Sequence, residues 1–203
     1  MNLSDTLALT GAAAAEHSAV VLVEGESDQM ALYSLAHRLG LDLDARRTAV
    51  VAMGGVTNIG HFVDLLAPIR QEIAVAGLYD AGEERQVRRA LERAGFGSHL
   101  ARSDLQSLGF FVCQADLEDE LIRSAGVSAV LEVAAQQGEL AAFRTFQAQS
   151  NWRGRSAEAQ LRRWIGAGAR RKLRYATLLA NELDLTHLPA PLDGLLTYLA
   201  RVS

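Results

Sequence analysis

Carboxylate side chains follow three of the four β-strands that the sequence predicts. These strands and acids are 20–23 with Glu24, 73–79 with Asp80, and 108–113 with Asp116 and Glu118. Alternating strands and helices predict a mostly parallel sheet, in which the C-terminal ends of all strands lie at one edge. We therefore expect these acids to converge, and a divalent cation such as Mg²⁺ would neutralise their mutual repulsion. Two such ions can stabilise the entering and leaving oxygens of a phosphodiester displacement.

Most of these acids also have a structural explanation, because carboxylates commonly cap helices or lie at the positive end of a helix dipole. The acids for which this alternative stays open are Asp28, Asp80, Glu83 and Asp116. Glu24 differs from them, because a glutamate between a buried strand and Gly25 caps nothing obvious. Of all these acids, Glu24 is therefore the one that the sequence favours most as a metal ligand or catalytic base.

Basic residues concentrate late in the chain. Residues 151–174 contain eight basic residues and one acid, a net charge of +7, so the rest of this chain of net charge −4 carries −11. Such a segment can hold a polyanion, although an arginine-rich surface helix is an equal alternative. Lys172 is the only lysine among 20 basic residues. Its compact ammonium could approach a scissile phosphate where a guanidinium would not fit, although chance explains a lone lysine equally well.

Several classes of site are disfavoured. Cys113 is the only cysteine, so no internal disulfide can form, and the five histidines show no zinc-ligand spacing. The chain has no P-loop motif and no Gly-x-Ser-x-Gly motif. An aromatic content of 6% argues against a base-stacking platform. No apolar run reaches membrane-spanning length and no signal peptide is indicated, so we expect a cytoplasmic protein.

The predicted organisation is one compact α/β domain with a helical addition. We expect a lead-in without a role at 1–18, an α/β core at 19–118, and a helical insertion with closing helices at 119–203. A further strand is predicted at 48–53. Predicted helices lie near 27–39, 58–66, 82–94, 118–125, 127–136, 138–149, 156–166, 170–183 and 192–201.

Five stretches in this order resemble a known family. They are VEGESD at 23–28, MGGVTNI at 53–59, LYD at 78–80, DLEDEL at 116–121 and RRKLRYA at 170–176. Together they are similar to the TOPRIM domain of the OLD (overcoming lysogenization defect) family of ATP-dependent endonucleases, over about residues 19–200. The resemblance implies a Rossmann-like parallel sheet with a helical insertion, one or two Mg²⁺ or Mn²⁺ ions, and cleavage of DNA.

The resemblance also implies roles for particular residues. Carried over by position, the metal ligands are Glu24, Asp28, Asp80, Asp116 and Glu118, with Glu24 and Lys172 as catalytic residues. The sequence departs from the pattern at Gly82, where the second aspartate of the family's Asp-x-Asp motif would stand. Glu83 or Glu84 could replace that aspartate, or one metal site could be weakened. The basic residues expected to hold DNA are Arg162, Arg163, Arg170, Arg171 and Arg174.

We therefore expect a metal-dependent endonuclease or phosphodiesterase that acts on DNA. One alternative is a catalytically reduced module that binds nucleic acid or docks a partner, and another is a phosphohydrolase or nucleotidyltransferase acting on a small nucleotide. Family members usually carry an ATPase half ahead of the TOPRIM region, whereas about 18 residues precede the first strand here. A stand-alone form, a separate ATPase partner and a homodimer are thus all expectations to be tested.

Overall fold

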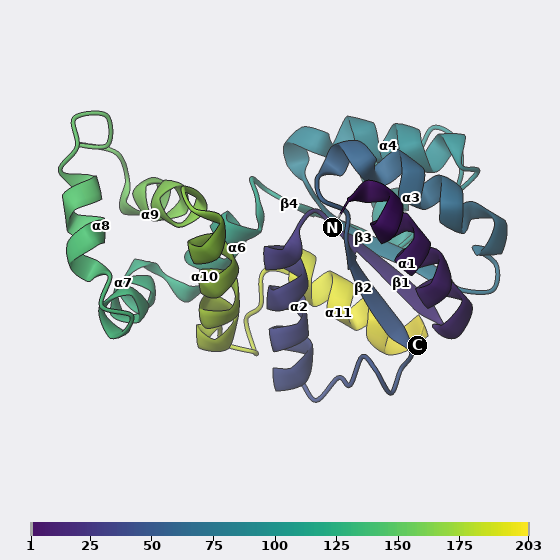
Figure 1. Ribbon diagram of the computed structural model, residues 1–203, viewed down its shortest axis with the longest axis horizontal. Coiled ribbons are helices and arrows are strands. Elements are labelled where there is room, and N and C mark those ends of the chain that lie inside the picture. The colour runs from purple at the N-terminus through teal and green to yellow at the C-terminus, as the bar shows by residue number, and fades with distance from the viewer. Residues whose placement is uncertain (1, 203) are drawn as a thin grey trace.

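The protein is built on a four-stranded parallel sheet with helices on both faces (Figure 1). The computed structural model describes residues 2–202. The strands are β1 (Ala19–Val23), β2 (Thr48–Ala52), β3 (Ala74–Asp80) and β4 (Phe110–Cys113). Their order in the sheet is β2-β1-β3-β4, and every neighbouring pair is parallel. The predicted α/β class and the parallel sheet are confirmed.

The helices follow the strands in the alternation that the sequence predicts. In chain order they are α1 (Leu3–Glu16), α2 (Glu26–Arg38), η1 (Val56–Asn58), α3 (Ile59–Leu66), η2 (Ala67–Ile69), η3 (Ala81–Glu83), α4 (Glu84–Arg93), α5 (Arg102–Ser107), α6 (Leu117–Ala125), α7 (Val127–Gln136), α8 (Leu140–Gln147), α9 (Ala157–Gly166), α10 (Ala169–Glu182) and α11 (Ala190–Val202).

The sheet separates two apolar cores. Side chains of β1 alternate between them, with Val21 and Val23 in one core and Val20 and Leu22 in the other. Helices α2 and α11 cover the first face, and α1, α3, α4 and α5 cover the second. Because β1 is buried on both sides, it is a continuous apolar run, as expected for an inner strand of a parallel sheet. Glu24 is consequently the first residue after β1 that can carry a charge.

Helices α6 to α10 form a separate lobe between β4 and α11, which we call the helical extension (Figure 1). Its helix α10 packs along α2 of the core. Arg38, at the end of α2, donates hydrogen bonds from Nη1 to the carbonyl oxygens of Ala180 (2.7 Å) and Leu183 (2.9 Å). This contact holds the C-terminal end of α10 against the core and so fixes the helix that carries Lys172.

Two elements bear on the sequence-based expectation. The lead-in, expected as a short helix or a loose segment without a role, forms helix α1, whose Leu3, Leu7 and Ala14 pack into the second core beside α3. Helix α5 was not predicted, because six residues are too few to show helical periodicity. Within residues 2–202, no helix has the length and apolar character needed to cross a lipid bilayer.

Candidate functional site

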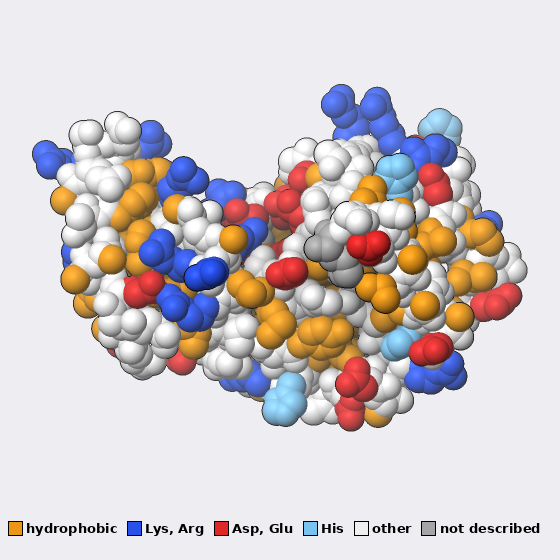
Figure 2. Space-filling model, in the orientation of Figure 1, with side chains coloured by type: hydrophobic (Ala, Val, Ile, Leu, Met, Phe, Trp, Pro, Cys, Tyr) orange, Lys and Arg blue, Asp and Glu red, His pale blue; other side chains and the backbone are white. Residues whose placement is uncertain are grey.

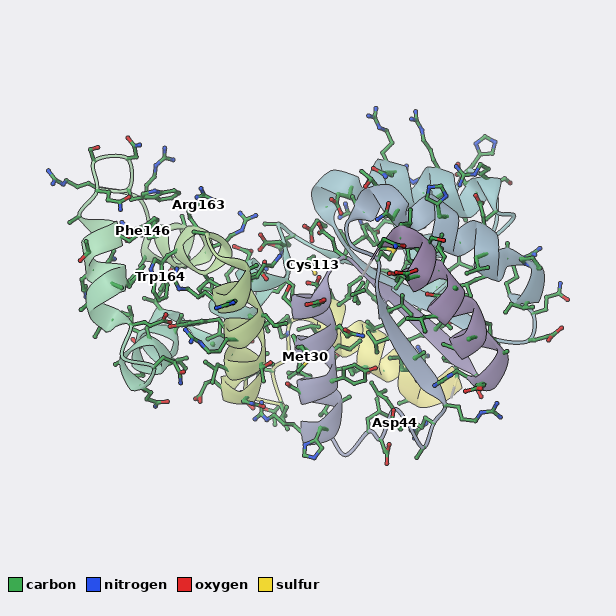
Figure 3. All side chains as sticks on the ribbon, in the orientation of Figure 1. Met30, Asp44, Cys113, Phe146, Arg163 and Trp164 are labelled. Carbon is green, nitrogen blue, oxygen red and sulfur yellow. The ribbon has the colours of Figure 1, made fainter. Side chains whose placement is uncertain are left out.

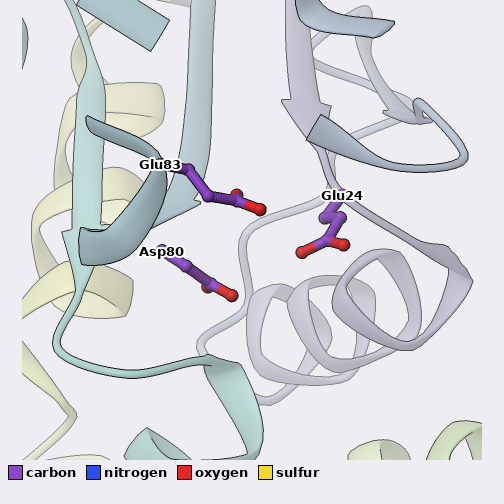
Figure 4. Close-up of side chains that lie close together, drawn as sticks. All are labelled: Glu24, Asp80 and Glu83. Carbon is purple, nitrogen blue, oxygen red and sulfur yellow. The ribbon is translucent and has the colours of Figure 1, made fainter. Parts of the chain in front are cut away.

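Three carboxylates converge at the C-terminal edge of the sheet. Glu24 follows β1, Asp80 ends the neighbouring strand β3, and Glu83 lies one 3₁₀ turn later. Each offers a carboxylate oxygen, and these oxygens all lie within 4.8 Å of one another. Figure 4 shows the three side chains pointing toward a common space. The convergence follows from the pairing of β1 with β3, because parallel neighbours end at the same edge.

The electrostatics of this acidic trio favour a bound cation. Burial raises the pKa of Asp80 to about 8, and the negative charges of Glu24, Glu83, Asp116 and Asp28 add to the effect. Burial, followed by the charge of Glu24, also raises the pKa of Glu83. Oε2 of Glu83 is buried and accepts no hydrogen bond from any residue between 2 and 202. A divalent cation would supply the missing positive partner.

A second group lies where the core meets the helical extension. Glu118, on α6, is 4% exposed, and its Oε2 lies 3.3 Å from Nζ of Lys172 on α10. Burial raises the pKa of Glu118 to about 7, although Lys172 opposes the shift. Burial alone would lower the pKa of Lys172, but the charges of Glu118, Asp28 and Glu24 raise it. Oε1 of Glu118 is buried without a hydrogen-bond partner among the residues described.

Asp28 and Asp116 combine structural contacts with a position in the site. Asp28, 8% exposed, accepts a hydrogen bond of 2.8 Å from the backbone N–H of Gly25, and burial raises its pKa. Asp116 is the N-cap of α6, where it accepts the Asp119 N–H at 2.8 Å. Its other oxygen pairs with Arg162 Nε at 2.7 Å. The structural explanation is thus correct for both acids: Asp116 caps α6 as predicted, and Asp28 lies in the first turn of α2, where the helix-dipole interpretation expected it. Both acids also lie near enough to the acidic trio to act on Asp80.

The structure distinguishes between the two acids that could replace the aspartate absent at Gly82. Glu83 joins Glu24 and Asp80, whereas Glu84 turns away to form ion pairs with Arg88 and Arg102, each at 2.5 Å. A Cβ added at Gly82 would meet no atom within 4 Å. The space is therefore open at this position, and the carboxylate comes from the next residue.

The basic residues are not all alike. Arg162 and Arg163 line a cavity of about 540 Å³ together with Lys172, whereas Arg170 is exposed on α10. Arg171 and Arg174 both pair with Glu139, at 3.7 and 2.5 Å, and the Arg171 guanidinium lies 4.2 Å from the centre of the Trp164 ring. These contacts give the last two arginines a role in holding the extension together, and a role in binding DNA stays a prediction for all five.

Acidic and basic side chains gather on different sides of the boundary between the core and the helical extension (Figure 2). Figure 2 shows a hollow between the two lobes, with acidic side chains on its floor and basic side chains on the extension beside it. Figure 3 places Cys113, which ends β4, near this boundary and Arg163 on the upper side of the extension. Two further residues of the cavity, Trp152 and Arg155, were not selected from the sequence. Both lie within the basic segment at 151–174, and the charge of that segment is the signal that could have found them.

Comparison with known proteins agrees with this architecture. The family model described as "Overcoming lysogenization defect protein-like, TOPRIM domain" matches residues 17–81. The C-terminal region of the Burkholderia pseudomallei OLD protein is 22% identical with a TM-score of 0.67, over 92% of this chain and 99% of that one. The C-terminal region of the Xanthomonas campestris pv. campestris OLD protein is 24% identical with a TM-score of 0.68, over 90% and 92%.

No curated protein sequence matches the chain significantly. The likeness to the two solved structures extends through the helical extension, and at these identities it establishes the fold. The family match covers β1 to β3 and the first two acids of the trio. The resemblance inferred from the sequence is confirmed to this extent: residues 17–81 match the OLD-like TOPRIM family model, and the chain shares the fold of the C-terminal regions of two OLD proteins.

Proposed function

We propose that the protein is a metal-dependent phosphodiesterase that cleaves DNA. The observation that carries the proposal is the convergence of Glu24, Asp80 and Glu83, with oxygens within 4.8 Å, at the edge of the sheet that adjoins Lys172. The OLD-like TOPRIM match supports a metal site that serves nucleic-acid chemistry. Action together with an ATPase is part of the proposal, since full-length OLD proteins carry an ATPase half.

The residues fit a divalent metal. All the donors are carboxylate oxygens, which Mg²⁺ and Mn²⁺ prefer, and two buried oxygens, one each on Glu83 and Glu118, have no protein donor among the residues described. Glu24, Asp80 and Glu83 would hold one ion. Asp28, Asp116 and Glu118 do not form a comparable group among the residues described, so a second ion stays a prediction. Bound there, the metal would stabilise negative charge on the reacting phosphate oxygens.

The chain's own residues would position the substrate and balance its charge. Lys172 is fixed by Glu118 at 3.3 Å and is about one third exposed, so its ammonium can also donate to a phosphate oxygen. Arg163 is exposed on the same cavity, where a guanidinium can bind phosphate in bidentate fashion. Glu24 faces the same space as Asp80 and can accept a proton from an attacking water.

The test is nicking of supercoiled plasmid in MgCl₂ or MnCl₂. Wild-type protein should convert plasmid to the open circular form, and Glu24→Gln should abolish the conversion. The matched control is Glu26→Gln, which makes the same chemical change two residues later at an exposed position in the first turn of α2. Unchanged cutting by Glu24→Gln would refute the proposal. Cutting of a small nucleotide but not of plasmid would favour the small-nucleotide alternative instead.

A further inference from the structure

The cavity in the helical extension is a continuation of the site. It has a volume of about 540 Å³, within the range of roughly 300–1,000 Å³ that is typical of small-ligand sites. Glu118 and Lys172 lie at the end next to the acidic trio, and Trp152, Arg155 and Arg163 line it as well. A chain held at the acids can therefore extend directly into this cavity.

We propose that this cavity binds one unpaired nucleotide of the substrate, with its base against Trp152 and its phosphate between Arg155 and Arg163. The inference rests on the proposed function, because it assigns the nucleotide that adjoins the reacting phosphate. Its consequence is a substrate class: single-stranded DNA, or duplex DNA with a frayed or overhanging end. A base inside a duplex is stacked on both faces and has none free for an aromatic side chain.

The aromatic ring is held in place before any ligand arrives. Trp152 packs against the Phe146 ring at a centroid distance of 5.2 Å and an interplanar angle of 31°. Its carbonyl oxygen accepts a hydrogen bond of 2.8 Å from Gln160, whose side-chain oxygen accepts another of 2.6 Å from Gln147. Gln160 is 6% exposed, so this network is buried and fixes the turn between α8 and α9. Preorganisation of this kind lowers the entropic cost of binding.

The charges of the cavity suit a phosphate. Arg155 and Arg163 are exposed and form no ion pair with any residue between 2 and 202, whereas Arg162 is already paired with Asp116. Two unpaired guanidinium groups beside one aromatic ring make up the donor set that unpaired nucleotides require. The low aromatic content of the chain argued against an extended stacking platform, but a pocket for one nucleotide needs only one ring.

The test is binding of a fluorescently labelled single-stranded oligonucleotide in CaCl₂, measured by anisotropy and compared with the same sequence as a blunt duplex. Wild-type protein should bind the single strand more tightly than the blunt duplex. Trp152→Ala should weaken single-strand binding roughly 5- to 150-fold, the range measured for loss of a base–aromatic stack, and leave duplex binding unchanged. Trp152→Phe should restore most of the affinity. Arg155→Ala should weaken binding more than Arg153→Ala, which removes a charge two residues away and outside the cavity.

A second measurement keeps the proposal testable if Trp152→Ala fails to fold. Trp164 is 3% exposed, so quenching of tryptophan fluorescence by the oligonucleotide should come from Trp152 and disappear in Trp152→Phe. Equal binding by folded wild type and Trp152→Ala, or no quenching, would overturn the inference. If the protein cuts plasmid but shows neither effect, the nucleotide subsite is refuted and the proposed nuclease function is retained. Quenching without metal-dependent cutting would support the subsite and refute the nuclease.

Discussion

Removal of the Glu83 carboxylate should weaken metal binding while the fold persists. Two carboxylate charges 4.8 Å apart repel each other by about 3.5 kcal/mol at an effective dielectric constant of about 20. A bound cation relieves this repulsion, so each carboxylate of the trio contributes to cation affinity by an energy of this order. Because Glu83 is partly exposed, we discount this figure to about 1.4–3 kcal/mol, or roughly a 10- to 100-fold increase in Kd for Mn²⁺ after Glu83→Gln.

The assay is thermal unfolding with and without MnCl₂. At a concentration of about 100 times Kd, the metal should stabilise the wild type by about 2.7 kcal/mol, which for a chain of 203 residues raises Tm by about 5–11 °C. At the same concentration the Glu83→Gln variant should gain only about 1–6 °C. Without metal its Tm should equal or exceed that of wild type, because the substitution removes a negative charge from an uncompensated group.

The control is the neighbouring acid. Glu84→Gln makes the same chemical change but breaks the ion pairs with Arg88 and Arg102, so it should lower Tm and leave the increment from Mn²⁺ intact. Gly82→Asp in the Glu83→Gln background should recover part of the increment, since a side chain at Gly82 meets no atom within 4 Å. A full metal increment in Glu83→Gln, or an equal loss in Glu84→Gln, would refute the reasoning.

Three further outcomes are expected. In metal-free protein Asp80 keeps a proton to about pH 8 when folded but to about 3.8 when unfolded, so stability should fall as pH rises from about 5 to 8.5, and Asp80→Asn should flatten this profile in thermal melts. Lys172→Met should lower the free energy of unfolding, measured in urea, by about 1–3 kcal/mol at pH 8.5. The decrease should be smaller at pH 6, where Glu118 is protonated, and an equal decrease at both pH values would contradict the pairing. Arg163→Ala should reduce the salt dependence of DNA affinity by about one counterion, whereas Arg171→Ala should lower Tm with little change in that slope, as filter binding at several salt concentrations would show.

Much of the fold was predictable because its signals are local. The run at 20–23 is apolar at every position, which matches a strand buried on both faces, and Gly40 and Gly95 mark helix ends with positive φ angles of 70° and 79°. The parallel arrangement followed from the alternation of strands and helices. The convergence of Glu24 with Asp80 followed from that arrangement, since their strands are neighbours.

The remaining features depend on directions of side chains, which spacing does not determine. Glu83 and Glu84 are adjacent acids, and only the 3₁₀ turn that precedes α4 directs one into the trio and the other toward arginines. Arg171 and Arg163 look alike in the basic segment, yet one packs on Trp164 and the other lines the cavity. Such differences arise from tertiary packing between α8, α9 and α10.

The hydrogen bonds from Arg38 to the end of α10 bear on the order in which the molecule folds. They join residues that are 142 and 145 positions apart in the chain. Contacts of such long range form slowly, because closing the long intervening loop costs conformational entropy before the contact itself stabilises the chain. The sheet with Glu24 and Asp80 can form before α10 docks and brings in Lys172. The acidic trio depends on β1, β3 and the turn after β3, whereas the ammonium group of Lys172 reaches it only through the docking of a helix from the extension.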